Sequence, residues 1–338
     1  MSTLELAKED PPHGEAEAVQ KLIALLKQRL DREYPSPQRT LRDAHSKQHG
    51  LVRAHFVVEK NLPEDLRIGV FKEPRTFPAW VRFSNAIDPP QADIAKNSRG
   101  MAIKLMEVDG KKFLDETMHA TTQDFVLMST QFFITKGATE FARLVEAVEG
   151  GFVRLMLHFV TQPRLLFLFL KARQRCASPL EVSYGSTTPY LLGTRAAKYT
   201  IRPTMPGTTR IPVTPSDDYL REAMVNHLSE REACFDFLIQ VQTDAMRMPI
   251  EDPRVVWSEK LSPFVKVATI QIPPQKFDTP TQREYGDNLT FNPWHCLPEH
   301  RPLGGINRAR KIIYETMSKY RHARNSASRD EPTGWTLY

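Results

Sequence analysis

The stretch from Leu51 to Gly110 decides the fold class of this chain. It contains four short runs rich in β-branched and aromatic residues, namely LVRAHFVVE (51–59), RIGVF (67–71), AWVRFSNA (79–86) and MAIKLMEVDG (101–110). Clusters of Pro, Asn and Asp separate the runs, and this pattern is typical of antiparallel strands joined by turns. The VDGK sequence at 108–111 indicates a hairpin.

A second β-rich section lies further along the chain, at AAKYTIR (196–202), FDFLIQVQT (235–243) and FVKVATIQI (264–272). Apolar residues at helical spacing predict helices over 16–34, 138–148, 151–176, 217–228 and 305–322. Many short strands with helices inserted and appended predict an α+β fold, built as a closed antiparallel barrel with helical additions.

Composition limits the class of protein. The chain has 338 residues, of which 41% are hydrophobic and 25% charged, which excludes a collagen-like, coiled-coil or wholly disordered chain. The net charge of +6 is small for this length and suits an anionic small molecule, a cofactor carboxylate or a membrane surface. We expect no nucleic-acid partner.

The cysteines and the N-terminus bear on location. Cys176, Cys234 and Cys296 lie far apart and form no CxxC motif, so a reducing compartment is expected. The first 17 residues lack a basic segment followed by an apolar one, so we see no signal peptide. Both features predict a cytoplasmic protein.

Common catalytic signatures such as GxGxxG, Walker A, GxSxG and HExxH are absent from the sequence. His295, Cys296 and His300 offer a metal cluster, but their spacing matches no zinc pattern and no fourth ligand is evident. Ordinary loop residues are the favoured interpretation.

The last predicted helix, INRARKIIYETMSKYR (306–321), carries the most informative side chains. Arg310 and Tyr314 are four residues apart and share a face, to which Arg321 returns seven residues later. A neighbouring guanidinium favours the phenolate form of a tyrosine, and phenolate is one of the few protein ligands of haem iron. A solvated basic helix face is the alternative for this segment taken alone.

Five motifs in the same order resemble the haem-dependent catalase family from about residue 45 to 325. They are a histidine on a strand (His55), VRFS (81–84), Asp93 followed by RGMAIK (99–104), FFI (132–134) and Arg310-x-x-x-Tyr314. The FLIQVQT segment at 237–243 is similar to a barrel strand of the family. The resemblance implies an eight-stranded catalase-like barrel without the C-terminal flavodoxin-like domain of large catalases.

The resemblance also implies a haem cofactor, with haem b as the expected form, and a role for each matching residue. Tyr314 would bind the iron and Arg310 would stabilise its phenolate. His55 would be the distal acid–base residue, held by a hydrogen bond to Ser84. Arg82 and Arg321 would pair with the haem propionates, and Phe141 would pack on the haem face.

The sequence departs from the family pattern in two places. The distal asparagine is replaced in the LMSTQ stretch (127–131), where Met128 or Ser129 takes its position. The propionate-binding arginine expected three residues before the distal histidine is Val52, with Arg53 next to it as the candidate replacement. The pattern is similar to a short catalase-like branch that includes enzymes of the allene oxide synthase type.

The expected function is therefore haem-dependent cleavage of peroxide O–O bonds, acting on hydrogen peroxide or on organic and fatty acid hydroperoxides. The alternatives are a fatty acid-modifying haem enzyme (an allene oxide synthase, hydroperoxide lyase or peroxygenase) and a haem-binding or sensing protein without catalysis. The expected organisation is a helical arm (1–40), a haem-binding domain (41–325) and a tail (326–338). Partners expected are a peroxide or lipid-like substrate, a membrane touched through residues 151–175, and a homo-oligomer.

Overall fold

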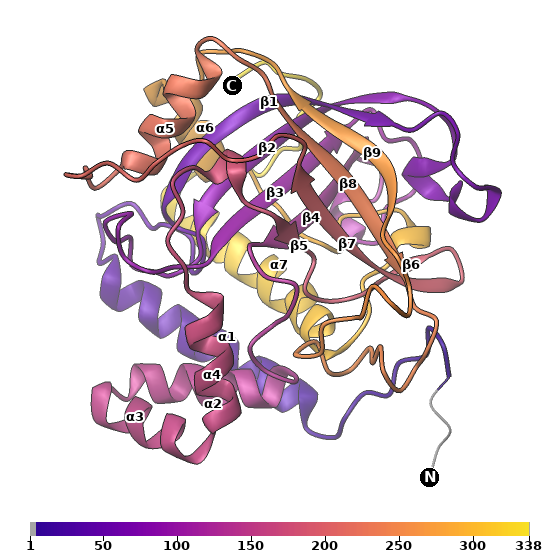
Figure 1. Cartoon of the computed structure of the whole chain (residues 1–338). Helices are drawn as coiled ribbons and strands as arrows, with labels where there is room; N and C mark the ends of the chain where they lie inside the picture. The colour runs from indigo at the N-terminus through magenta and orange to yellow at the C-terminus, as the bar shows by residue number, and fades with distance from the viewer. Residues whose placement is uncertain (1–4, 338) are drawn as a thin grey trace.

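The protein is described by a computed structural model that covers residues 5–337 (Figure 1). Eight antiparallel strands close into a barrel, because β5 pairs with both β4 and β7. In sheet order they are β5 (Tyr184–Gly185), β4 (Thr122–Met128), β3 (Arg99–Met106), β2 (Thr76–Asn85), β1 (Gln48–Val58), β9 (Val265–Ile272), β8 (Ala233–Val241) and β7 (Arg195–Pro203). A ninth strand, β6 (Tyr190–Leu192), pairs with β7 outside the closed ring. The predicted α+β barrel is confirmed.

The barrel interior is filled by side chains. Phe56, Phe125 and Phe237 come from three strands, and their ring centroids lie 5.1–6.1 Å apart. Val52, Ala54, Phe56 and Val58 follow the alternation of β1 and are all fully buried in the same cluster. Because the interior is a packed core, a ligand has to bind outside the barrel wall.

Long helices cover one end and one side of the barrel. α1 (Glu15–Glu33), α2 (Ala138–Glu149) and α7 (Gly305–Asn325) pack together through a common apolar cluster. α5 (Tyr219–Leu228) and α6 (Pro280–Asn288) both contact β1. Short 3₁₀ turns lie at 64–66, 69–71, 115–117, 179–181 and 298–300.

The helix predicted over 151–176 is two helices, α3 (Phe152–Thr161) and α4 (Pro163–Ala172), bent by 113°. Pro163 begins α4 because a proline at the first helical position has no N–H that needs a partner and its ring disfavours continuation of the preceding helix. Figure 1 shows this pair next to α1 and α2, away from the barrel.

The C-terminal tail packs on the outside of β2 and β3. The indole N–H of Trp335 donates to the carbonyl of Ala79 at 3.0 Å, and that of Trp80 donates to the carbonyl of Gly334 at 3.2 Å. Glu331 pairs with the buried Lys104 at 2.7 Å. The tail is therefore part of the folded domain rather than a loose extension.

Candidate active site

A cavity lies between the outer face of the barrel and α7. It holds about 690 Å³ of space between protein atoms, counting its open mouth. The segment before β1, strands β2, β3 and β4, the 290–291 loop and α7 all contribute. The lining residues are Arg42, Asp43, Ala44, His45, Arg82, Ser84, Gly100, Met101, Ala102, Val126, Leu127, Thr290, Phe291, Tyr314, Ser318 and Arg321.

His45 is the histidine of this cavity. Its Nδ1 lies 3.0 Å from Oγ of Ser84, so Ser84 can accept the Nδ1–H and leave Nε2 unprotonated. A Cβ at Gly100 would lie 2.3 Å from Nδ1 of His45, so only glycine allows the imidazole this position. Burial, reinforced by Arg82, lowers the pKa of His45 to about 3. The ring is therefore neutral at physiological pH.

The predicted hydrogen bond between Ser84 and His55 is wrong. In the ladder between β1 and β2, Ser84 is opposite Gln48, whereas His55 is opposite Pro78. Six residues of strand, about 20 Å, separate Pro78 from Ser84. The His55 ring instead makes an edge contact with Trp335 of the tail, with ring centroids 5.1 Å apart.

The sequence contains a signal for the histidine of this cavity. The spacing of an arginine three residues before a distal histidine fits Arg42 and His45, but fails at Val52 and His55. His45 precedes the first strand, in a loop with positive φ of 58°, so a search for a histidine within a strand run misses it.

Three arginines face the same cavity. Arg82 donates through Nε to Gln48 and to the carbonyl of Gly286, and its buried Nη2 makes no hydrogen bond within residues 5–337 but lies 3.7 Å from a carboxylate oxygen of Asp287. Burial and the charge of Arg42 lower the pKa of Arg82 to about 9. Burial, then Arg42 and Arg82, lower the pKa of Arg321 well below its usual value. This concentration of cations is suited to binding anionic groups.

Arg53 does not reach the cavity. Its guanidinium lies over the Trp80 ring, 6.0 Å from the centroid, and its backbone N–H bonds Gln275. Arg42 lines the cavity instead. It is therefore a better candidate than Arg53 for the propionate-binding arginine.

α7 supplies Tyr314 to the other wall. Tyr314, Ser318 and Arg321 line the cavity at i, i+4 and i+7, so they lie on one helix face, as the sequence predicts for Tyr314 and Arg321. Arg310 is buried, but it donates to Thr188 at 3.3 Å and Asn307 at 3.2 Å. Among the described atoms, no hydrogen bond of Arg310 goes to Tyr314, so its expected phenolate partner role stays a prediction.

The remaining predicted site residues lie next to the cavity rather than in it. Met128 is on the same face of β4 as Val126, two residues away, while Ser129 Oγ accepts the backbone N–H of Arg99 at 2.8 Å. The Phe141 ring packs on Phe133, with centroids 5.6 Å apart. The structure thus gives Phe141 a position in the apolar cluster shared by α1, α2 and α7.

The His295, Cys296 and His300 cluster is not a metal centre. No group of three or more metal-ligating side chains occurs in residues 5–337. His295 lies between the hydroxyls of Thr117 and Thr122, at 2.7 and 2.6 Å. His300 accepts the backbone N–H of Val70 at 3.1 Å, so these side chains have structural partners.

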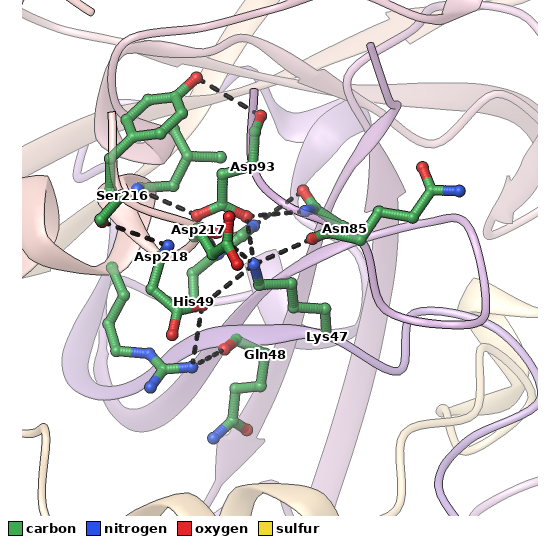
Figure 2. Close-up of polar contacts among 12 residues, drawn as sticks. Lys47, Gln48, His49, Asn85, Asp93, Ser216, Asp217 and Asp218 are labelled. Carbon is green, nitrogen blue, oxygen red and sulfur yellow. Dashed lines mark hydrogen bonds and ion pairs between the residues drawn. The ribbon is translucent and has the colours of Figure 1, made fainter. Parts of the chain in front are cut away.

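A buried polar network fixes the chain immediately after His45 (Figure 2). The carboxylate of Asp93 meets Nζ of Lys47 at 2.9 Å, Nδ2 of Asn85 at 3.0 Å and the backbone N–H of Leu220 at 3.1 Å. The Nε2–H of His49 donates to Oδ1 of Asn85 at 2.8 Å. The network therefore joins the start of β1, the end of β2, the loop before β3 and the start of α5.

The cavity residues fit a haem group. Two haem propionates would supply carboxylates to Arg42, Arg82 and Arg321, including the buried Nη2 of Arg82 that lacks a hydrogen bond. The Tyr314 phenol on α7 and the His45 imidazole by the barrel belong to different walls of the cavity. Tyr314 would therefore hold the haem iron from one wall, and His45 would supply an acid–base group from the other.

Comparison with known proteins agrees on the fold. No protein-family model and no curated protein matches this sequence. Among solved structures, a fungal catalase matches with a TM-score of 0.69 and 15% identity over 95% of this chain and 66% of its own. Catalase A from Saccharomyces cerevisiae gives 0.68 and 15% over 98% and 72%, and a bacterial catalase 0.65 and 14% over 96% and 63%.

The chain thus spans about two thirds of the length of these catalases. At 14–15% identity the similarity shows the fold alone. The roles of individual residues have to be argued from the geometry of the site. The sequence, the barrel and the structural matches agree on one statement: this chain has the fold of the catalases.

Proposed function

We propose that the protein is a haem-dependent oxidoreductase that cleaves the O–O bond of peroxides. The observation that carries the proposal is that His45, Tyr314 and three arginines line one cavity between the barrel and α7. A haem-sensing protein needs an axial ligand and propionate partners, but it has no need of the paired His45 and Ser84.

His45 would be the acid–base residue. Its lowered pKa keeps the imidazole neutral, so Nε2 can accept a proton from one peroxide oxygen and return it to the other. The departing oxygen then leaves as water or as an alcohol. Ser84 holds the ring and its tautomer through the 3.0 Å contact with Nδ1.

The cofactor would be held by residues of both walls. Arg42, Arg82 and Arg321 would bind the propionates, and the Tyr314 oxygen would bind the iron. A bound haem would supply the iron at which peroxide is activated and the oxidising equivalents are held.

Organic hydroperoxides are the second candidate substrates. Ala102 and Val126 on the barrel side and Phe291 in the 290–291 loop give the cavity apolar surface, whereas the side chains of Met101 and Leu127 belong to the barrel core. No Asn or Gln is among the described residues that line it. An alkyl group would find favourable contacts there, and hydrogen peroxide would lack an amide to orient it.

The first experiment tests cofactor and ligand together. Titration of the purified protein with haem, followed by absorbance, should give one equivalent bound and a high-spin ferric spectrum. Tyr314→Phe should change that spectrum, while Tyr320→Phe, a partly exposed tyrosine of α7 that bonds Asp31, should leave it unchanged. Failure of the native chain to bind haem would refute the proposal.

The substrate is decided by a side-by-side assay on the haem-loaded protein. Oxygen evolution from hydrogen peroxide is compared with product formation from a polyunsaturated fatty acid hydroperoxide, analysed by mass spectrometry. Turnover of hydrogen peroxide alone, with kinetics indifferent to added fatty acid, would exclude the organic substrate. Haem binding without turnover of either compound would leave a haem-binding protein.

A further inference from the structure

The helix pair α3–α4 exposes a concentration of large apolar side chains. Eight of the fifteen exposed large hydrophobic residues between residues 5 and 337 lie in the 23 residues from Val148 to Leu170. The most exposed are Val160 (78%), Phe152 (75%) and Val153 (71%). A soluble monomer rarely gathers so many on one surface unless that surface binds something.

The exposed residues of α3 form one face. At about 100° per residue, positions 152, 153, 156, 157 and 160 fall within an arc of about 140°. The buried Phe159 lies at the edge of this arc, about 20° beyond position 152, and packs on Phe169 of α4 with ring centroids 5.2 Å apart. α3 therefore already packs against the protein through another part of its surface, so a rotation of the helix about its axis does not explain the exposed apolar face.

The pair is also firmly attached to the domain. Ser98 donates to the carbonyl of Ala172 at 2.7 Å, and Asn97 and Gln174 exchange backbone hydrogen bonds of 3.3 and 3.1 Å. These contacts join the end of α4 to the loop before β3, the strand that carries Gly100 of the cavity. A surface presented by α3 and α4 has a fixed relation to the active site.

The charge around this face is mainly positive. Residues 150–180 contain Arg154, Arg164, Lys171, Arg173 and Arg175 but no Asp or Glu, and of these Arg154 pairs with Glu146 of α2 at 2.9 Å. Apolar residues flanked mainly by cations are the pattern of a helix that lies in the interface of an anionic bilayer. No single helix in residues 5–337 is long and apolar enough to cross a membrane, and the α3–α4 pair meets that requirement only with its 113° bend. Each helix has ten residues and is about 15 Å long.

We propose that the exposed face of α3 and α4 docks the protein on an anionic lipid membrane. A second copy of the chain is the competing occupant, and the charges argue against it. A symmetric contact through this face would bring two sets of Arg164, Lys171, Arg173 and Arg175 together without an acidic group from 150–180, since the nearby Glu146 already pairs with Arg154. An anionic headgroup layer has the complementary charge.

The test is partition of the full chain onto sedimented vesicles. Phosphatidylcholine vesicles are compared with vesicles containing about one third phosphatidylglycerol. We expect binding to the anionic vesicles at least about tenfold stronger than to the neutral ones, and weaker binding at 0.5 M salt because exposed charges are screened.

Two pairs of variants separate the contributions. Phe152→Ser with Val160→Ser removes apolar contact and should reduce partition by about tenfold or more. The matched control is Met205→Ser with Val213→Ser, at residues that are 74% and 103% exposed elsewhere on the surface. Arg164→Gln with Lys171→Gln should reduce binding to anionic vesicles, whereas Arg210→Gln with Arg231→Gln, two exposed cations outside the pair, should not.

Two results would overturn the proposal. One is that the native chain binds anionic vesicles no more strongly than the variant with Phe152→Ser and Val160→Ser. The other is self-association of the native chain in sedimentation equilibrium that the same variant abolishes, with no binding to vesicles. Vesicle binding is measured without peroxide, so its failure is distinct from a failure of the proposed catalysis.

Discussion

The imidazole of His45 is positioned by two small residues. Ser84 contacts Nδ1 at 3.0 Å, and Gly100 leaves the space that any Cβ would occupy. The motifs VRFS and RGMAIK contain these two residues. The histidine predicted from the sequence, His55, lies ten residues after His45. Sequence spacing identifies strand residues well, but the register that brings a loop histidine to them is a tertiary property.

Replacing Ser84 with Ala should lower peroxide turnover by about tenfold, because a group that orients a reactive histidine contributes about that much. The native rate should be independent of pH between 5 and 8, since the lowered pKa of His45 keeps the ring neutral throughout. The variant should keep this plateau at a lower rate, because burial and Arg82 still lower the pKa of His45, and it should bind haem as the native chain does. A pH–rate profile and a haem titration measure both, and Ser84→Thr, which keeps the hydroxyl, is the control.

If Ser84→Ala weakened haem binding and left the rate of bound enzyme unchanged, Ser84 would be a structural residue only.

At the scale of elements, most strand and helix positions followed from the sequence because their periodicity is local. The strand predicted at 67–71 is wrong, because residues 69–71 form a 3₁₀ turn. The predicted runs at 196–202, 235–243 and 264–272 correspond to β7, β8 and β9. The segment 151–176 was predicted as one helix, and the bend at Pro163 divides it. Closure of the barrel through the two-residue strand β5 has no sequence signal, because a strand that short shows no alternation.

The network around Asp93 holds the first residues of β1 and therefore the loop that carries His45. Asp93→Ala would remove the fully buried carboxylate of this network and leave Lys47 only the half-exposed Asp218, and removal of one partner of a buried pair costs about 3 kcal/mol. We expect a lower urea midpoint and a lower turnover per bound haem. Asp109→Ala, at a carboxylate whose side chain is 84% exposed, should change the free energy of unfolding by less than about 0.5 kcal/mol.

Equal stability of the Asp93 and Asp109 variants would show that the network does not hold this loop.

At the scale of the whole molecule, several buried histidines make stability sensitive to acid. Burial lowers the pKa of His45 and His295 to about 3, and of His49 and His300 to about 4. In the unfolded chain a histidine has a pKa near 6.5. Below that pH the unfolded state binds more protons, so stability falls as the pH falls from about 6.5 toward 4. Burial raises the pKa of Asp124, which offsets part of this slope.

The expected result is a clearly lower urea midpoint at pH 5.0 than at pH 7.5. Each histidine contributes up to about 1.4 kcal/mol per pH unit in this range. Denaturation curves at half-unit intervals measure the slope, and His300→Asn, which keeps an acceptor for the Val70 N–H, should reduce it. A midpoint equal or higher at pH 5.0 would contradict the assignment of these histidines as neutral buried groups.

The whole-molecule fold also explains the two candidate histidines, because both lie near the first strand but at different ends of it. His45 precedes β1 and faces the cavity with Tyr314, whereas His55 lies in β1 under the C-terminal tail. One comparison therefore tests the central claim most directly: the rate of peroxide consumption by haem-loaded His45→Ala and His55→Ala, followed by stopped flow. The account predicts at least a 100-fold lower rate for His45→Ala, in the range of about 10²–10⁴ for loss of an acid–base residue, and a rate within about twofold of native for His55→Ala. A native rate in His45→Ala together with a large loss in His55→Ala would contradict it.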